Sequence, residues 1–259
     1  MKSTTGRSPP RILILDIGGS HVKASFSDHP SRLRIVSGPT MTPGRMVRLL
    51  KPHLQGHVYD VVAIGYPGLV SQGQIVREPH NLGTGWVGFD FERAFARPTR
   101  VLNDAAMQAL GSYRRGHSLF LGLGTGLGSA MVLDGRVQPM ELAHLPYKKG
   151  RTFEDYVGEA ALERYGRKRW EKEVHDVVEI LVAALEPDDV VLGGGNVRRI
   201  KQLPPGTRAG NNRNAFVGGI RVWRDAAEWS ELIGKSVPVK RTSPPPVRAA
   251  RKSKRSGRR

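Results

Sequence analysis

Two glycine-rich segments of the chain have the composition of phosphate-binding turns. They are Asp16-Ile-Gly-Gly-Ser20 and Gly124-Thr-Gly-Leu-Gly128, and each begins where a short apolar run predicts the end of a buried strand. Glycines let backbone N–H groups approach a phosphate without interference from a Cβ atom, and a serine hydroxyl adds a donor. Either segment alone also fits a plain β-turn. Their equivalent places in two halves of the chain favour phosphate binding.

Asp16 is placed to serve a metal ion at the first of these turns. A carboxylate at a strand end could hold Mg²⁺ through water, because this ion combines a few carboxylates with phosphate oxygens. The second segment matches neither the dinucleotide-binding fingerprint, because a strand rather than a long helix follows it, nor a P-loop, because it lacks the Gly-Lys-Ser/Thr ending.

Two pairs of polar residues have the types needed to handle a hydroxyl group. Asn103-Asp104 lies at a predicted strand-to-helix junction, where ligands gather in α/β folds. Asp104 could act as a general base toward an attacking hydroxyl, although a helix cap is the simpler interpretation of that residue alone. Glu141 and His144 suit a polyhydroxyl ligand, a metal or an ordinary surface turn.

The apolar pattern predicts two α/β halves that begin in the same way, with a strand pair around a glycine-rich turn. The boundary between them falls near residues 104 to 117, and Asp134-Gly135 predicts a hairpin. Strands are expected at 11–16, 21–27, 32–37, 60–65, 100–103, 118–124, 129–133 and 188–192, and helices at 42–54, 104–114, 168–185, 196–202 and 216–232.

The composition excludes several classes of site. The 259 residues include no cysteine, which rules out disulfides, thiolate zinc sites, iron–sulfur clusters and a cysteine nucleophile. Lys and Arg number 41 against 23 Asp and Glu, giving a formal net charge of +18. No apolar run approaches the length of a signal segment or a membrane span, so the expected compartment is the cytoplasm.

Much of the positive charge lies in the last residues, 235–259, which are rich in Pro, Ser and Arg and contain no acidic residue. Such a segment buries too little apolar surface to offset the entropy of ordering, so it is expected to be disordered. It could contact polyanions, or it could be a solubilising appendage.

Taken in order, the motifs resemble those of the ROK family of sugar kinases, and in particular its polyphosphate glucokinase branch. The likeness spans about residues 11 to 225. The segments that carry it are Asp16-Ile-Gly-Gly-Ser20, Gly65-Tyr-Pro-Gly68, Asn103-Asp104-Ala105, Gly124-Thr-Gly-Leu-Gly128, Glu141-Leu-Ala-His144 and Gly193-Gly-Gly195.

The resemblance implies an α/β protein with the actin-like ATPase fold, in which two ribonuclease-H-like lobes enclose a central cleft. On this basis we expect a disordered leader over residues 1–10, an N-terminal lobe over 11–105, a C-terminal lobe over 106–234 and a disordered basic tail over 235–259. A homodimer is also expected.

The resemblance assigns roles residue by residue. Asp104 would be the base that activates the sugar hydroxyl. The residues expected to hold the sugar are Gly68, Asn81, Asn103, Glu141 and His144. Those expected to line the phosphates are Asp16, Gly18, Gly19, Ser20, Thr125 and Gly126, with Gly194 and Gly195 beside the nucleotide or the far end of a longer donor.

Mg²⁺ is the expected metal, held by Asp16 through water. No zinc is expected, because the cysteine-rich loop of most family members is replaced here by Leu145-Pro-Tyr147. Two further departures, Ala106 and Ala143 in place of the usual family residues, bear on the identity of the substrate rather than on the mechanism.

The expected reaction is transfer of a phosphoryl group from polyphosphate or ATP to the 6-hydroxyl of glucose. The basic composition favours the longer anionic donor. A kinase for another hexose is an alternative, and so is a non-catalytic sugar sensor or regulator. A DNA-binding regulator would need an N-terminal helix-turn-helix, for which the residues before Arg11 are too few.

Overall fold

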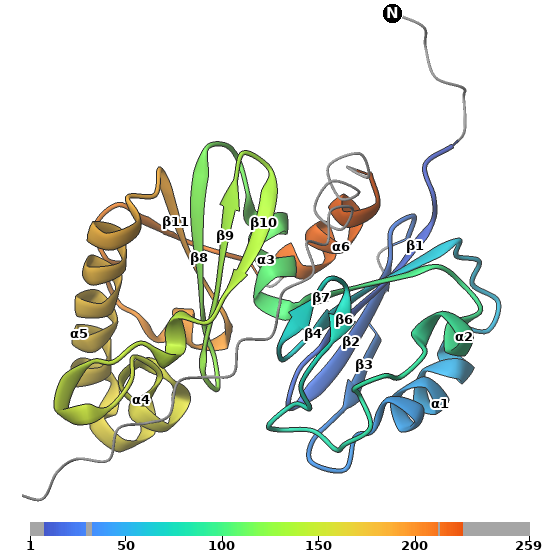
Figure 1. Cartoon of the computed structure of the whole chain (residues 1–259), viewed down its shortest axis with the longest axis horizontal. Coiled ribbons are helices and arrows are strands. Elements are labelled where there is room, and N and C mark those ends of the chain that lie inside the picture. Colours follow the sequence, from blue (N-terminus) through green and yellow to red (C-terminus); the bar gives the residue numbers. More distant parts are fainter. Residues whose placement is uncertain (1–7, 30–32, 212, 225–259) are drawn as a thin grey trace, which may run out of the picture.

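The computed structural model of the chain describes residues 8–29, 33–211 and 213–224. The expected tail over 235–259, residues 225–234 and most of the expected leader lie outside the described residues. Two five-stranded sheets lie side by side, and two helices, α3 and α6, lie between them (Figure 1).

The first sheet has the strand order β3-β2-β1-β4-β7. Strands β1 to β3 form an antiparallel meander, and β4 and then β7 extend the sheet parallel to β1. The bounds are β1 Ile12–Ile17, β2 His21–Phe26, β3 Leu33–Val36, β4 Val61–Tyr66 and β7 Thr99–Asn103. The accompanying elements are α1 Pro43–Leu54, the small hairpin of β5 Val70–Ser71 and β6 Gln74–Ile75, and α2 Phe91–Phe95.

The second sheet repeats the first, with the strand order β10-β9-β8-β11-β12 and the same strand directions. The bounds are β8 His117–Leu123, β9 Leu127–Leu133, β10 Arg136–Met140, β11 Asp189–Gly193 and β12 Thr207–Ala209. Its helices are α4 Glu154–Val157 and α5 Glu159–Leu185, with short 3₁₀ helices η1 Leu142–His144, η2 Lys148–Gly150 and η3 Gly195–Arg199. The repeat confirms the predicted pair of ribonuclease-H-like lobes and the actin-like ATPase fold.

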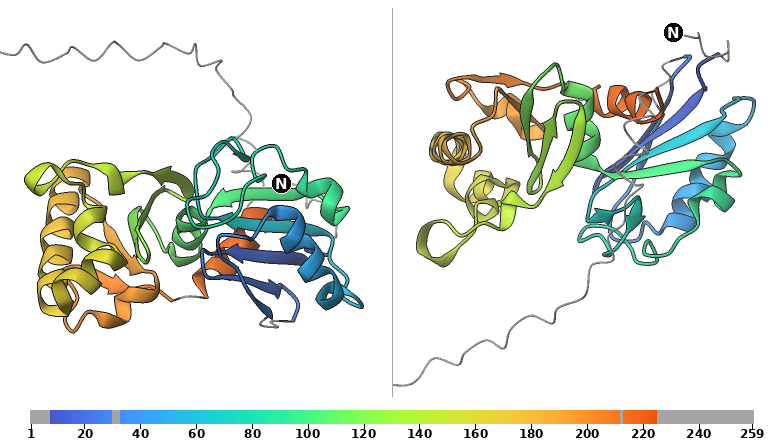
Figure 2. Two further views of the ribbon diagram at one scale, coloured as in Figure 1. Left: turned by 90° about the horizontal axis from the view of Figure 1, so that it is seen from below. Right: turned by 45° about the horizontal axis from the view of Figure 1, so that its top comes forward.

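The two lobes exchange helices. Helix α3 (Asp104–Ser112) leaves the first sheet but packs on β8 to β10 of the second, and α6 (Asn214–Arg224) leaves the second sheet but packs on β1 and β4 of the first. In both views of Figure 2, α6 (orange-red) lies against the first lobe. The sequence prediction places α6 with the C-terminal lobe, whereas in the fold it completes the core of the N-terminal one.

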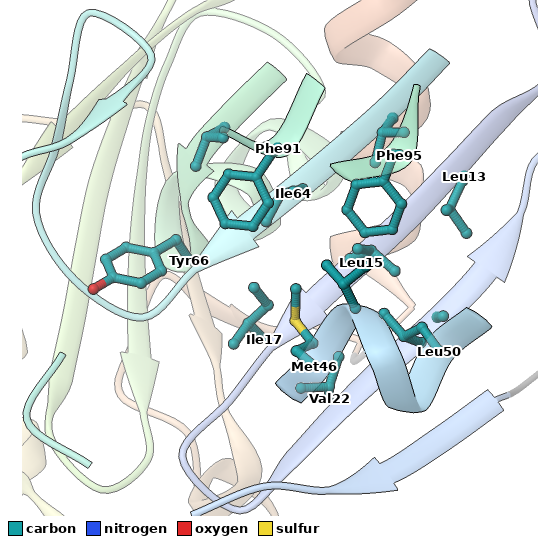
Figure 3. Close-up of a cluster of buried hydrophobic side chains, with 14 of the residues drawn as sticks. Leu13, Leu15, Ile17, Val22, Met46, Leu50, Ile64, Tyr66, Phe91 and Phe95 are labelled. Atoms are coloured by element: carbon teal, nitrogen blue, oxygen red, sulfur yellow. The ribbon is translucent and has the colours of Figure 1, made fainter. Parts of the chain in front are cut away.

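Strand β1 is buried on both faces, which explains its unbroken apolar run before Asp16. Leu13, Leu15 and Ile17 point toward α1 and α2, as Figure 3 shows, while Ile12 and Ile14 pack among residues of α3 and α6. Side chains alternate along a strand, so Asp16 shares the face of Ile12 and Ile14. The sequence therefore places this carboxylate on the face that looks toward the second lobe.

Most predicted elements are confirmed, and the misses have local causes. The helix expected at 168–185 begins at Glu159, with a break in helical geometry at Gly166 (φ 72°). Its first turns are largely exposed and polar, so no apolar period marks them. The helix expected at 196–202 is the 3₁₀ helix η3, and the one expected at 216–232 is described as far as Arg224.

Candidate active site

The carboxyl ends of the parallel strands of the first sheet gather the predicted site residues of that lobe. Asp16 pairs in register with Gly65, and Tyr66 pairs with Asn103. The glycine turn follows β1, Gly68 follows β4, and Asp104 follows β7. These segments therefore meet at one edge of the sheet, as ligand-binding segments do in open α/β sheets.

Asp16 is buried and carries an ion pair that the sequence prediction missed. Lys23 stands opposite Asp16 on β2, and its Nζ lies 2.8 Å from Asp16 Oδ2. The Asp16 side chain is 9% exposed and that of Lys23 is 43% exposed. The sequence feature that could have indicated this pair is the position of Lys23 between the apolar residues Val22 and Ala24, on the strand that follows the glycine turn.

Asn103, and not Asp104, is the cap of helix α3. Asn103 Oδ1 accepts a hydrogen bond from Ala106 N at 3.1 Å, and its Nδ2 donates to the Gly68 carbonyl at 3.0 Å. This side chain ties the end of β7 to the turn after β4. Asp104 is the first residue of the helix, and its Oδ1 accepts from Ala105 N at 2.7 Å.

Asp104 is partly exposed, yet its surroundings are mostly protein. Burial, and next the negative charge of Asp16, raise the pKa of Asp104 to about 7, while backbone hydrogen bonds and Lys23 act in the opposite direction. A carboxylate that titrates near neutral pH can accept a proton and release it again, as a general base must. The three side chains form one electrostatic cluster.

Two glycine turns of the second lobe lie side by side. The turn after β8 places Thr125 at the surface and is closed by a hydrogen bond from Gly124 N to Gly126 O at 3.0 Å. Asn196 Nδ2 donates to the Gly124 carbonyl at 3.2 Å, which joins this turn to the one after β11. Gly194 there has φ +83° and packs so closely on the backbone of Leu123 that a Cβ atom would overlap it. Thr125, Gly126, Gly194 and Gly195 are therefore brought together.

The second lobe reaches the first at the start of α3. A Cβ atom on Gly128 would lie 3.0 Å from the Cβ of Ala105, the residue that follows Asp104. The glycine turn that ends at Gly128 is thus next to the first turn of α3. A larger residue at position 128 would push the two apart.

Glu141 and His144 lie at the same end of the second sheet as the glycine turn. Met140 pairs with Ser129 in register, and Ser129 Oγ donates to Met140 O at 2.8 Å while accepting from Leu142 N at 3.1 Å. His144 Nε2 lies 3.6 Å from Glu141 Oε2, and both side chains are more than half exposed. They are available to a ligand.

Asn81 lies beside the first glycine turn, although some sixty residues separate them in the sequence. A Cβ atom on Gly19 would lie 3.1 Å from Asn81 Cβ. The loop that carries Asn81 is closed by Glu78, whose carboxylate accepts hydrogen bonds from the backbone N–H groups of Gly85, Trp86 and Val87. The sequence prediction singled out Asn81 and missed Glu78.

Among the described residues, no group of three or more His, Asp and Glu side chains is placed to hold a metal ion. Mg²⁺ that arrives with a phosphate donor needs few protein ligands, and the buried carboxylate of Asp16 at a strand end fits that requirement. Over the same part of the chain, no helix is both long and apolar enough to cross a membrane.

A cavity of about 570 Å³ lies elsewhere, at the opposite ends of β8 and β11. It is lined by Arg114, Arg115, Gly116, Asp188 and Asp189, none of which belongs to the predicted site. This cavity is therefore separate from the predicted site.

The fold and the site together define a two-lobed protein of the actin-like ATPase fold, with paired glycine turns and a partly exposed carboxylate at the junction. The ROK family model matches residues 15–139, which include Asp16, Asp104 and both glycine turns that follow β1 and β8. The chain is therefore similar to the ROK family over this segment, which is just under half of its 259 residues.

Similar proteins include a polyphosphate glucokinase from Mycobacterium leprae, which is 26% identical over 213 residues. That match covers 74% of this chain and 65% of the relative, so the chain spans just under two thirds of its length.

Two solved structures share the fold. The polyphosphate/ATP-glucomannokinase of Arthrobacter sp. strain KM has a TM-score of 0.70 at 24% identity, over 82% of this chain and 97% of its own. A ROK family transcriptional regulator, a homolog of the E. coli MLC protein, has a TM-score of 0.69 at 16% identity, over 86% of this chain and 80% of its own.

Proposed function

We propose that this protein is a sugar kinase that transfers the terminal phosphoryl group of polyphosphate or ATP to the 6-hydroxyl of glucose. The observation that carries the proposal is the position of Asp104. It is a carboxylate with a pKa raised to about 7, at the start of α3, where it feels the charge of Asp16 in the first lobe and where the next residue, Ala105, lies against Gly128 of the second. Phosphoryl transfer to an alcohol needs this combination of a base and phosphate-binding backbone.

In the proposed reaction Asp104 accepts the proton of the attacking sugar hydroxyl. Asn103 orients this carboxylate indirectly, because it caps α3 and ties the helix start to Gly68. Asn81, Glu141 and His144 hold the other sugar hydroxyls. Asn103 Nδ2 carries a second N–H group beyond the one given to Gly68, which allows it to contact the sugar as well.

The glycine turns supply backbone N–H groups to the phosphate donor. Gly18, Gly19 and Ser20 serve from the first lobe and Thr125 and Gly126 from the second, with Gly194 and Gly195 alongside. Bound Mg²⁺, held by Asp16 through water, would neutralise charge on the transferring phosphate. Because the two sets of turns come from different lobes, the donor would lie at the junction between them.

The names of the similar proteins support the proposed donor and sugar. The mycobacterial relative is named a polyphosphate glucokinase, and the Arthrobacter structure is that of a polyphosphate/ATP-glucomannokinase. The net charge of +18 suits a long polyanionic donor. The chain also shares its fold with a transcriptional regulator, so the fold alone does not decide between enzyme and regulator.

A coupled assay for glucose 6-phosphate, with ATP and long-chain polyphosphate offered separately, tests the proposal. Product formation with either donor, lost in Asp104→Asn, supports it. Glucose binding without product formation, by a protein that retains Asp104, would instead favour the regulator. Mannose, fructose and N-acetylglucosamine, each tested by direct detection of the sugar phosphate formed, identify the sugar.

A further inference from the structure

The loop from Glu78 to Val87 is closed by a single carboxylate. Glu78 Oε1 accepts hydrogen bonds from Gly85 N at 3.1 Å and Val87 N at 3.2 Å, and Oε2 accepts from Trp86 N at 3.1 Å. Hydrogen bonds to an ionised acceptor are stronger than neutral ones. The carboxylate therefore holds the two ends of this loop together.

The loop is also anchored from inside. Leu82 is buried, and Gly83 N donates to the Met41 carbonyl at 3.0 Å. Trp86 is fully buried and packs against Tyr66 with ring centroids 5.6 Å apart. With these contacts made, Asn81 is left exposed at the turn of the loop.

Closure of the loop fixes where Asn81 lies. Asn81 lies close to the backbone of Gly19: a Cβ atom added to Gly19 would lie only 3.1 Å from the Cβ of Asn81. Leu82 and Gly83 anchor the chain just after Asn81, and Glu78, three residues before Asn81, joins this stretch to the backbone of residues 85–87. The position of Asn81 against the glycine turn therefore depends on Glu78.

We propose that Glu78 is a positioning residue for the sugar: it closes the loop over residues 78–87 and so holds Asn81 against the Gly18–Ser20 turn. This inference rests on the proposed function, in which Asn81 holds the sugar and the turn holds phosphate. Glu78 touches neither substrate. It couples the two sites by fixing the distance between them.

The first test compares the kinetics of Glu78→Ala, Glu78→Gln, Asn81→Ala and the double variant Glu78→Ala/Asn81→Ala. Glu78→Ala should raise the KM for glucose about tenfold and leave kcat within about threefold, since the loss of charged hydrogen bonds displaces a binding group. Glu78→Gln keeps one acceptor oxygen and should fall between wild type and Glu78→Ala. In the Asn81→Ala background, Glu78→Ala should add little, as expected for residues that act together.

Glu92→Ala is the matched control. Glu92 also accepts a backbone hydrogen bond, from Thr99 N at 3.1 Å, but it lies outside the proposed site. It should leave the KM for glucose unchanged. An unchanged KM in Glu78→Ala, or additive effects in the double variant, would overturn the proposal.

A second measurement does not depend on activity. Hydrogen–deuterium exchange of Glu78→Ala, or of Glu78→Gln if the alanine variant does not fold, should become faster both at residues 80–87 and at residues 18–20. Faster exchange in the loop alone means that Glu78 is merely structural and overturns the proposal. A wild-type protein that phosphorylates no hexose refutes the proposed function, and the exchange experiment still decides the role of Glu78.

Discussion

Lys23 Nζ lies 2.8 Å from Asp16 Oδ2, and the two residues face one another across the β1–β2 pair. The pair lies beside Asp104, whose pKa is raised by the negative charge of Asp16 and lowered by the positive charge of Lys23. Lys23 thus offsets the negative charge of the buried Asp16 next to Asp104, the proposed base, which must titrate near neutral pH.

The first prediction concerns Lys23. Lys23→Met removes a positive charge near Asp104, so the pKa of Asp104 should rise further above about 7. Because a general base acts when deprotonated, the midpoint of kcat/KM against pH should move to higher pH. The measurement is a kcat/KM profile from pH 5 to pH 9.

Lys172→Met is the matched control for this experiment. Lys172 also pairs with a carboxylate, lying 3.0 Å from Asp176, but on helix α5 away from the proposed site. Its profile should coincide with that of the wild type. Coincident midpoints for Lys23→Met and the wild type would show that Lys23 does not influence the base.

The second prediction is that wild-type activity rises with pH through about 7, the value to which the pKa of Asp104 is raised. Asp104→Asn cannot accept the proton and should lose a factor of roughly 10² to 10⁴ in kcat, with glucose affinity nearly unchanged. Titration calorimetry with glucose and the coupled assay measure the two quantities. A substantial residual kcat would place the base elsewhere.

The third prediction uses the same variant to test stability. The native pKa of Asp104 is raised from 3.8 to about 7, so the folded protein binds more protons than the unfolded chain between these values and loses stability as pH rises through them. Asp104→Asn removes this loss. At pH 8 the free energy of unfolding of Asp104→Asn should exceed that of the wild type by on the order of 1 to 2 kcal/mol, after allowance for solvent screening. Its Tm should be a few degrees higher.

Thermal unfolding at pH 8 and pH 4 checks the sign of this effect. The gain should disappear at pH 4, where Asp104 is protonated in the native state. A gain of the same size at both pH values would mean that the stabilisation does not come from titration of Asp104.

Much of the fold could be predicted because its signals are local. Thr42 before Pro43 predicts the start of a helix, and Thr42 does cap α1 by accepting from Arg45 N. Asp134-Gly135 predicts a hairpin, and both residues have the positive φ values, 49° and 89°, that this turn needs. The glycine turns after β1 and β8 were found for the same reason.

The features that were missed depend on contacts between distant segments. A lysine in a strand and a glutamate in a loop are ordinarily solvated, so the local sequence does not identify the partners of Lys23 or Glu78. Their partners become visible when β2 pairs with β1 and when the loop over residues 78–87 closes. The exchange of α3 and α6 between the lobes likewise has no local signal, because either sheet could have accepted either helix.

The last prediction concerns the glycines that let α3 and α6 cross closely. A Cβ atom on Gly218 would overlap the carbonyl oxygen of Met107, and one on Gly111 would overlap that of Asn214. Gly218→Ala must therefore push the two helices apart, which should cost about 1 to 3 kcal/mol and lower Tm by several degrees. Gly44→Ala is the control, because a Cβ atom there meets no neighbour within 4 Å and alanine favours the helix. Since α3 begins at Asp104 and α6 supports β1, Gly218→Ala should also lower kcat. Retention of full activity and stability in Gly218→Ala would show that the close crossing of the helices is not needed to place Asp104.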